Sequence, residues 1–140
     1  MTMAVLLDAS VMVALFDDND RHHRACVDRI RRLPKGSELV TTWPCATEAS
    51  YLLSPRNHLV LLGWLERGGA RLVNAESIEL GEWMVWMRRY SEQGKALMDL
   101  ADASLIWLAI KEDTRRILTE DQRDFSRYRL PDGRAFEVVQ

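Results

Sequence analysis

Residues 98–110, with the sequence MDLADASLIWLAI, place two acidic residues at the start of an apolar helix. Asp99 and Asp102 are three residues apart and share a helix face, where two like charges cost about a few tenths of a kcal/mol. Two explanations for this pair are open. Asp99 is the N-cap and Asp102 a first-turn acid, both stabilised by the positive end of the helix dipole. Alternatively, a divalent cation binds carboxylates that gather here from several parts of the chain.

On both sides of this helix, short apolar runs alternate with helical patterns. Residues 4–7 form a continuous apolar run, typical of a buried strand in a parallel sheet, that ends at Asp8. Ser10 is the expected cap of the next helix, and an apolar helix face is expected through Leu59, Leu62 and Leu65. Further strands are expected at 39–42, 70–73, 116–119 and 135–139, and helices at 11–16, 21–33, 45–53, 55–67, 77–90 and from 99. This alternation predicts a three-layer α/β/α fold with a mainly parallel, roughly five-stranded sheet, in a single domain spanning residues 1–140.

The composition is that of a soluble globular protein, with 47% apolar and 29% charged residues. No apolar run approaches the roughly 20 residues of a membrane span. The N-terminal sequence MTMAVLLD lacks a basic segment and reaches an acid too early for a signal peptide. Cys26 and Cys45 stand in no metal-binding or redox spacing, which fits unpaired thiols in a reducing compartment. We therefore expect a cytoplasmic protein in which neither thiol is a nucleophile.

The basic residues are mainly arginines, although the net charge is only −2. Arginine suits the recognition of phosphate and carboxylate groups. Residues 114–134 contain six arginines and four acids, which makes this segment locally basic. A solvated surface explains such a segment equally well. If the protein binds a nucleic acid, the predicted phosphate contacts are Arg115, Arg116, Arg123 and Arg127.

Acidic residues stand at equivalent places in the predicted topology. In open α/β sheets, ligands bind beyond the carboxyl ends of the strands. Acids at or near such ends are Asp8, Glu48, Asp99, Asp102 and Asp121. Gathered carboxylates repel one another unless a cation binds, and Mg²⁺ held by carboxylates and water is the usual arrangement for phosphate chemistry. Ser10 or Thr119 is then placed to orient the attacking water or a phosphate oxygen.

Other catalytic apparatus is missing from the sequence. The chain has no GxxxxGK[ST] loop, no GxGxxG turn and no GxSxG elbow. Its three histidines show no pairing with a nucleophile. Hydrolysis of a phosphodiester through a carboxylate-held metal is therefore the chemistry that the residues favour.

Four short segments in order resemble the motifs of a PIN domain. They are LLDAS at 6–10, TEA at 47–49, DLADA at 99–103 and LTEDQRDF at 118–125. Their order and spacing are similar to those of the VapC-type toxin ribonucleases of bacterial toxin–antitoxin pairs. The resemblance covers essentially the whole chain.

This resemblance implies a metal-dependent endoribonuclease that uses Mg²⁺ or Mn²⁺ and cuts tRNA or another structured RNA. It also implies a homodimer and an antitoxin partner that blocks the site. Asp99 resembles an extra acid found in a subset of these proteins, so it is a further candidate metal ligand. Glu120 stands beside Asp121 where the family pattern has a single acid, which leaves open which of the two faces the metal. The acidic quartet implied here is Asp8, Glu48, Asp102 and Asp121.

Two other functions fit parts of the same sequence. A receiver-type signalling domain needs an acidic pair near the first strand and a late lysine, whereas Asp8 stands alone and the last lysine is Lys111. A catalytically silent PIN-like interaction module would use its tryptophan-rich helices to bind a partner but would have no use for the acidic quartet. Mn²⁺ binding separates this module from the nuclease. Five tryptophans also predict self-association through residues 59–65 and 83–87.

Overall fold

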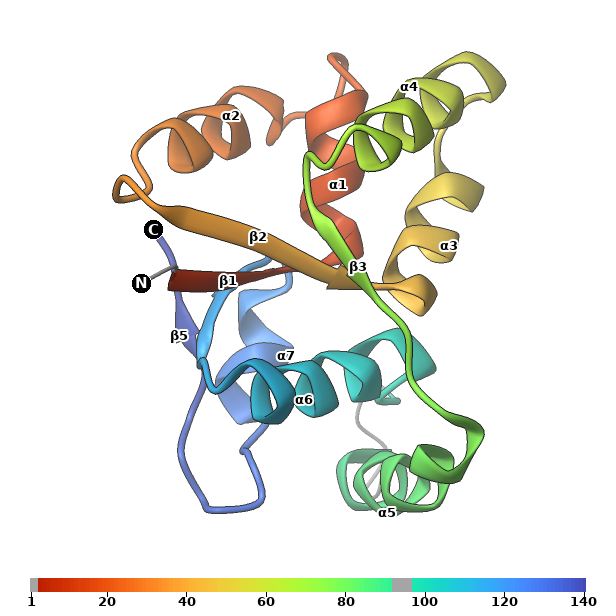
Figure 1. Ribbon diagram of the computed structural model, residues 1–140, viewed down its shortest axis with the longest axis vertical. Helices are drawn as coiled ribbons and strands as arrows, with labels where there is room; N and C mark the ends of the chain where they lie inside the picture. Colours follow the sequence, from red (N-terminus) through yellow and green to blue (C-terminus); the bar gives the residue numbers. More distant parts are fainter. Residues whose placement is uncertain (1–2, 92–96) are drawn as a thin grey trace.

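The structure is a computed structural model that describes residues 3–91 and 97–140, and its centre is a parallel sheet (Figure 1). The sheet has the strand order β3-β2-β1-β4-β5, and every neighbouring pair of these strands is parallel. The strands are β1 (Met3–Leu7), β2 (Ser37–Thr42), β3 (Arg71–Val73), β4 (Arg116–Leu118) and β5 (Glu137–Val138). The predicted five-stranded α/β fold is therefore confirmed, with a fully parallel rather than mainly parallel set of strands.

Helices cover both faces of the sheet. Figure 1 shows α1, α2 and α4 on one side and α5, α6 and α7 on the other. Helix α3 leads away from the carboxyl end of β2 and contacts both α1 and α6. The helices are α1 (Ala9–Phe16), α2 (His23–Arg31), α3 (Trp43–Leu52), α4 (Pro55–Glu66), α5 (Leu80–Ser91), α6 (Leu100–Glu112) and α7 (Gln122–Arg127), with a 3₁₀ turn η1 at Ser77–Glu79.

Local sequence explains where several helices begin. The Thr42 hydroxyl accepts a hydrogen bond from the Cys45 N–H at the start of α3, and the Ser54 hydroxyl does the same for the Asn57 N–H at the start of α4. Both helices also carry a proline in the first turn, where its missing N–H is not needed. These caps fix α3, and with it Glu48, relative to the end of β2.

The hydrophobic core is built around β1 and α6. Val5, Leu6 and Leu7 are fully buried, and α6 is buried along most of its length. Three of the five tryptophans are buried as well, and Trp83 of α5 packs on Trp107 of α6 with ring centroids 5.8 Å apart. Within the described part of the chain, no helix has the length and apolar character needed to cross a membrane.

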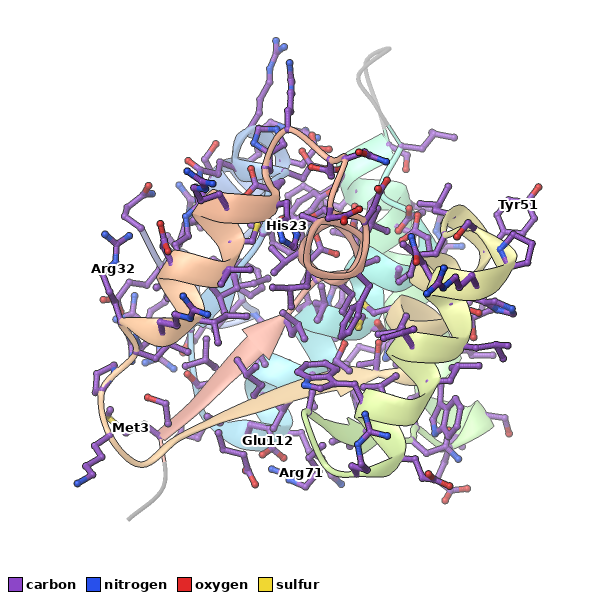
Figure 2. The ribbon with its side chains drawn as sticks, turned by 90° about the horizontal axis from the view of Figure 1, so that it is seen from above. Met3, His23, Arg32, Tyr51, Arg71 and Glu112 are labelled. Atoms are coloured by element: carbon purple, nitrogen blue, oxygen red, sulfur yellow. The ribbon has the colours of Figure 1, made fainter. Side chains whose placement is uncertain are left out.

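Some local predictions were wrong. Helix α1 begins at Ala9 rather than Val11, because Asp8 instead of Ser10 is its N-cap. In α4 the buried residues are Leu61 and Leu65, whereas Leu59 is 64% exposed and Leu62 is 40% exposed. Helix α7 was not expected. The Arg71 and Glu112 side chains, labelled in Figure 2, form an ion pair that joins β3 to the end of α6.

The strand order reverses between β1 and β4. The chain goes from β1 to β2 and β3 on one side of β1, and then returns to β4 and β5 on the other side. The two strands stay paired to their ends, since the Asp8 N–H donates to the Leu118 carbonyl at 3.1 Å. Such a reversal opens a crevice beyond the carboxyl ends of the two strands, where α/β proteins bind ligands.

Candidate active site

Asp8 lies directly after β1, where the strand order reverses, and is held by three donors. Its Oδ1 accepts from the Ala9 N–H at 2.7 Å, and its Oδ2 accepts from the hydroxyls of Thr119 at 2.7 Å and Ser10 at 3.0 Å. Asp8 is only 5% exposed. Burial raises the pKa of this carboxyl above its usual value, and these hydrogen bonds oppose the rise. The carboxylate is thus fixed in one orientation.

The Ser10 and Thr119 hydroxyls support Asp8 directly. Thr119 is fully buried, and its hydroxyl also accepts from the Asp121 N–H at 2.9 Å. Ser10 likewise accepts from the Glu120 N–H at 3.0 Å. Both hydroxyls donate to Asp8 and accept from backbone N–H groups after β4. This geometry favours a role in holding Asp8 over the predicted contact with water or phosphate.

Asp99 and Asp102 lie at the start of α6. Asp99 is the N-cap, and its Oδ1 accepts from the Asp102 N–H at 2.8 Å, so the capping explanation of this pair is confirmed for Asp99. Asp102 is only 8% exposed, and its Oδ2 accepts from the Tyr128 hydroxyl at 2.7 Å. Burial, followed by repulsion from Asp99, raises the pKa of Asp102 to about 8. The capping role of Asp99 does not by itself explain why the Asp102 carboxyl is buried.

Glu48 and Asp121 complete the acidic quartet from two further elements. Glu48 lies on α3, where burial, followed by repulsion from Asp99 and Asp8, raises the pKa of its half-buried carboxyl. Asp121 is the residue before α7, and burial together with its contacts to Asp124 raises its pKa to about 6. Each of the four carboxyls is thus partly desolvated, and Asp8 repels each of the other three, so the structure brings the four acids to the same end of the sheet.

The Glu120 side chain points away from the acidic quartet and toward α2. Its carboxylate forms an ion pair with Arg29 of α2, lies 3.1 Å from the His22 Nδ1 and accepts from the Cys26 thiol at 3.1 Å. Burial is the main cause that raises the pKa of the Cys26 thiol to about 12, so this cysteine is not a nucleophile near neutral pH. Of the two neighbouring acids, Asp121 is the one that lies near the rest of the quartet, since its charge raises the pKa of both Glu48 and Asp102.

Chemically, the acidic quartet fits a hard divalent cation. Among residues 3–91 and 97–140, none of its carboxylates forms an ion pair with a lysine, arginine or histidine. The same residues contain no group of three His, Cys, Asp or Glu side chains close enough to hold one ion by themselves. Mg²⁺ usually keeps several waters and takes one or two carboxylates, so the donor set fits such an ion with water completing its shell.

The four predicted RNA contacts lie in two places. Arg123 and Arg127 are on α7, directly after Asp121, and Arg127 pairs with Asp124 at 3.1 Å. Arg115 and Arg116 stand at the start of β4, which is the opposite end of the strand from the acids. The structure brings only the first pair near the crevice.

The apolar helices predicted for self-association differ in exposure. In the segment 83–87, Trp83 and Trp86 are buried in the core. In the segment 59–65, Leu59 and Leu62 remain exposed, beside a groove of about 520 Å³ between α3 and α4. Tyr51, which lines this groove, is 86% exposed and projects from the surface in Figure 2.

Sequence reasoning missed Tyr128, Arg29 and His22. Tyr128 lies 26 residues after its partner Asp102, and Arg29 lies 91 residues before Glu120. No spacing rule within a helix or strand joins residues so far apart. The only signal for Tyr128 was an aromatic residue next to a charged segment, which indicates a core position rather than a partner for a carboxylate.

Comparison with known proteins agrees with this architecture. The chain is 30% identical to ribonuclease VapC26 of Mycobacterium tuberculosis over 142 residues, which covers 96% of this chain and 99% of that protein. The fold is similar to VapC20 of M. tuberculosis, a sarcin-ricin loop cleaving toxin, with a TM-score of 0.69 and 16% identity over 81% of this chain and 86% of that one. It is also similar to VapBC2 of Rickettsia felis bound to a DNA fragment from its promoter, with a TM-score of 0.68 and 13% identity over 99% and 100% of the two chains. The model of the PIN domain matches residues 5–130, and the chain therefore belongs to the PIN domain family.

Proposed function

We propose that this protein is a metal-dependent endoribonuclease, the toxin of a toxin–antitoxin pair, which hydrolyses phosphodiester bonds of tRNA or another structured RNA. The observation that carries the proposal is the acidic quartet, which has no basic partner in the described residues and gathers near the carboxyl ends of β1 and β4. The 30% identity to ribonuclease VapC26 over nearly the whole of both chains supports RNA as the substrate. Residues 1–140 form one catalytic domain in this proposal, including 1–2 and 92–96, which lie outside the described residues.

The proposed ligands of Mg²⁺ or Mn²⁺ are the acidic quartet, with Asp99 as an additional acid at its edge. When bound, the cation would activate a water and stabilise the charge on the phosphodiester during in-line attack. Asp8 offers a carboxylate whose orientation is fixed by Ser10 and Thr119. Asp102 offers a carboxylate from which most water is excluded, which strengthens its attraction for a cation.

Two arginines are the proposed phosphate contacts near the site. Arg123 is exposed on α7, and Arg127 is half-buried one turn later. The phosphate backbone of an RNA that reaches the acids passes α7. The two arginines therefore balance the negative charge of the RNA close to the acids. Arg115 and Arg116 are proposed contacts only for an RNA long enough to reach the other end of β4. Loss of phosphate contacts lowers the salt dependence of binding.

The proposed partner is an antitoxin that inserts a basic side chain among the acidic quartet. Such a side chain replaces the charge of the cation, and a desolvated charge pair loses much affinity when one member is removed. The proposed oligomer is a homodimer formed through the exposed apolar residues of α3 and α4. The proposed location is the cytoplasm, and the two buried unpaired cysteines fit its reducing conditions.

Isosteric substitutions test the proposal. Asp8→Asn, Glu48→Gln, Asp102→Asn and Asp121→Asn should each abolish cleavage of tRNA in Mg²⁺ while the protein stays folded by circular dichroism. Asp99→Asn should reduce cleavage less than Asp102→Asn does. The matched control is Asp113→Asn, which removes one carboxylate from the other end of α6. Wild-type cleavage rates in three of the four quartet variants would show that the quartet is wrong.

A further inference from the structure

The hydrogen bond between Tyr128 and Asp102 joins two elements that the proposed reaction needs. We propose that Tyr128 is a positioning residue, which holds the Asp102 carboxylate in the orientation that receives the divalent cation. The proposal rests on the proposed metal-dependent function. Tyr128 itself touches neither cation nor RNA in this arrangement, because it is fully buried behind Asp102.

The geometry of the bond is that of a strong, specific contact. The Tyr128 hydroxyl donates to Asp102 Oδ2 at 2.7 Å, a short distance typical of a hydroxyl bound to a carboxylate. A tyrosine hydroxyl has one proton to donate, so this bond uses it. With Oδ2 engaged from behind, rotation of the carboxylate is restricted, and Oδ1 is the oxygen left for the crevice.

Aromatic neighbours fix the position of the Tyr128 ring. Phe125 meets it edge-on at 5.1 Å between ring centroids, and Tyr90 of α5 meets it at 5.0 Å. Tyr90 also accepts from the Arg129 N–H at 2.9 Å, which ties α5 to the residue after Tyr128. The hydroxyl of Tyr128 is therefore directed by packing on two sides, and Asp102 is oriented by a rigid support.

Helix α7 links this support to a second acid. Asp121 precedes α7 and Tyr128 follows it, with the fully buried Phe125 between them. Asp121 and Tyr128, which is the partner of Asp102, thus lie at the two ends of one short, packed segment. Outer residues that orient metal ligands commonly change metal affinity by about 10- to 100-fold when they are replaced.

The test is Mn²⁺ binding to Tyr128→Phe, measured by titration calorimetry on the full chain without RNA. This change removes the hydroxyl and keeps the ring. We expect the Kd for Mn²⁺ to rise about tenfold or more. The matched control is Tyr90→Phe, which removes a hydroxyl from the same aromatic group without a contact to Asp102; it loses only the bond from the Arg129 N–H, so its Kd should rise much less than that of Tyr128→Phe. Cleavage by Tyr128→Phe should return to nearly the wild-type kcat in excess Mn²⁺.

A second pair of variants separates orientation from packing. In an Asp102→Asn background, Tyr128→Phe should cause no further loss of Mn²⁺ affinity, because the oriented carboxylate is already gone. An unchanged Kd in Tyr128→Phe, or equal losses in Tyr128→Phe and Tyr90→Phe, would overturn the positioning role while leaving the nuclease intact. Wild-type protein that binds no Mn²⁺ would overturn the proposed function and this inference together.

Discussion

Replacing Asp102 with asparagine should make the metal-free protein more stable at neutral pH. The carboxyl is 8% exposed, and its burial raises its pKa from 3.8 to about 8. An acid with a higher pKa in the folded state takes up a proton on folding. Its stabilising contribution is therefore complete below the unfolded pKa, near 3.8, and is lost as the pH rises toward about 8. Asparagine removes this dependence and still accepts the bond from Tyr128.

The size of the effect follows from the two pKa values. Between about pH 5.5 and about pH 7.5, the wild type should lose about 2.5 kcal/mol more unfolding free energy than Asp102→Asn does. The assay is urea unfolding in EDTA, followed by tryptophan fluorescence at several pH values. Asp113→Asn controls for the loss of one negative charge from the same helix. Parallel pH profiles for the wild type and Asp102→Asn would refute the reasoning.

Three further results are expected. Mn²⁺ at a hundred times its Kd should raise the unfolding free energy of the wild type by about 2.7 kcal/mol, and melting curves indifferent to Mn²⁺, Mg²⁺ and Ca²⁺ would favour the silent module. Arg29→Ala should destabilise the protein by about 2 kcal/mol in urea unfolding, since it removes the main partner of the half-buried Glu120, and a loss below about 0.5 kcal/mol would contradict that role. Leu61→Ala should cost about 2–5 kcal/mol in the same assay, whereas Ile78→Ala, an exposed position outside the proposed dimer face, should stay within about 0.5 kcal/mol, and equal effects would contradict the burial of Leu61.

The sheet and the order of the acids were predictable because the signals are local. A continuous apolar run such as residues 4–7 reads as a buried strand, and the acid that follows it falls at the carboxyl edge of a parallel sheet. Capping was less predictable. Asp8 and Ser10 are both good cap residues, and the choice between them depends on pairing of Asp8 with Leu118 across the sheet.

Other features had no local signal. Helix α4 carries apolar residues on most of its faces, so periodicity identified Leu65 as buried but selected Leu59 and Leu62 in place of Leu61. Helix α7 has six residues with one buried side chain, Phe125, which is too short for a helical period to show. The contact of Tyr128 with Asp102 depends on where the residue after α7 lies relative to the start of α6, and only the folded chain determines that.

The late position of β4 in the chain has a consequence for fragments of this protein. The crevice exists only where β4 lies against β1, yet the first quartet acid is residue 8 and the last is residue 121. A chain that is still being synthesised, or one cut before Arg116, contains Asp8, Glu48 and Asp102 but has neither Thr119 nor Asp121. Such a chain carries three acids of the proposed quartet but cannot assemble the proposed site. The proposed RNA cleavage therefore cannot begin before β4 and Asp121 have been synthesised and β4 has folded against β1.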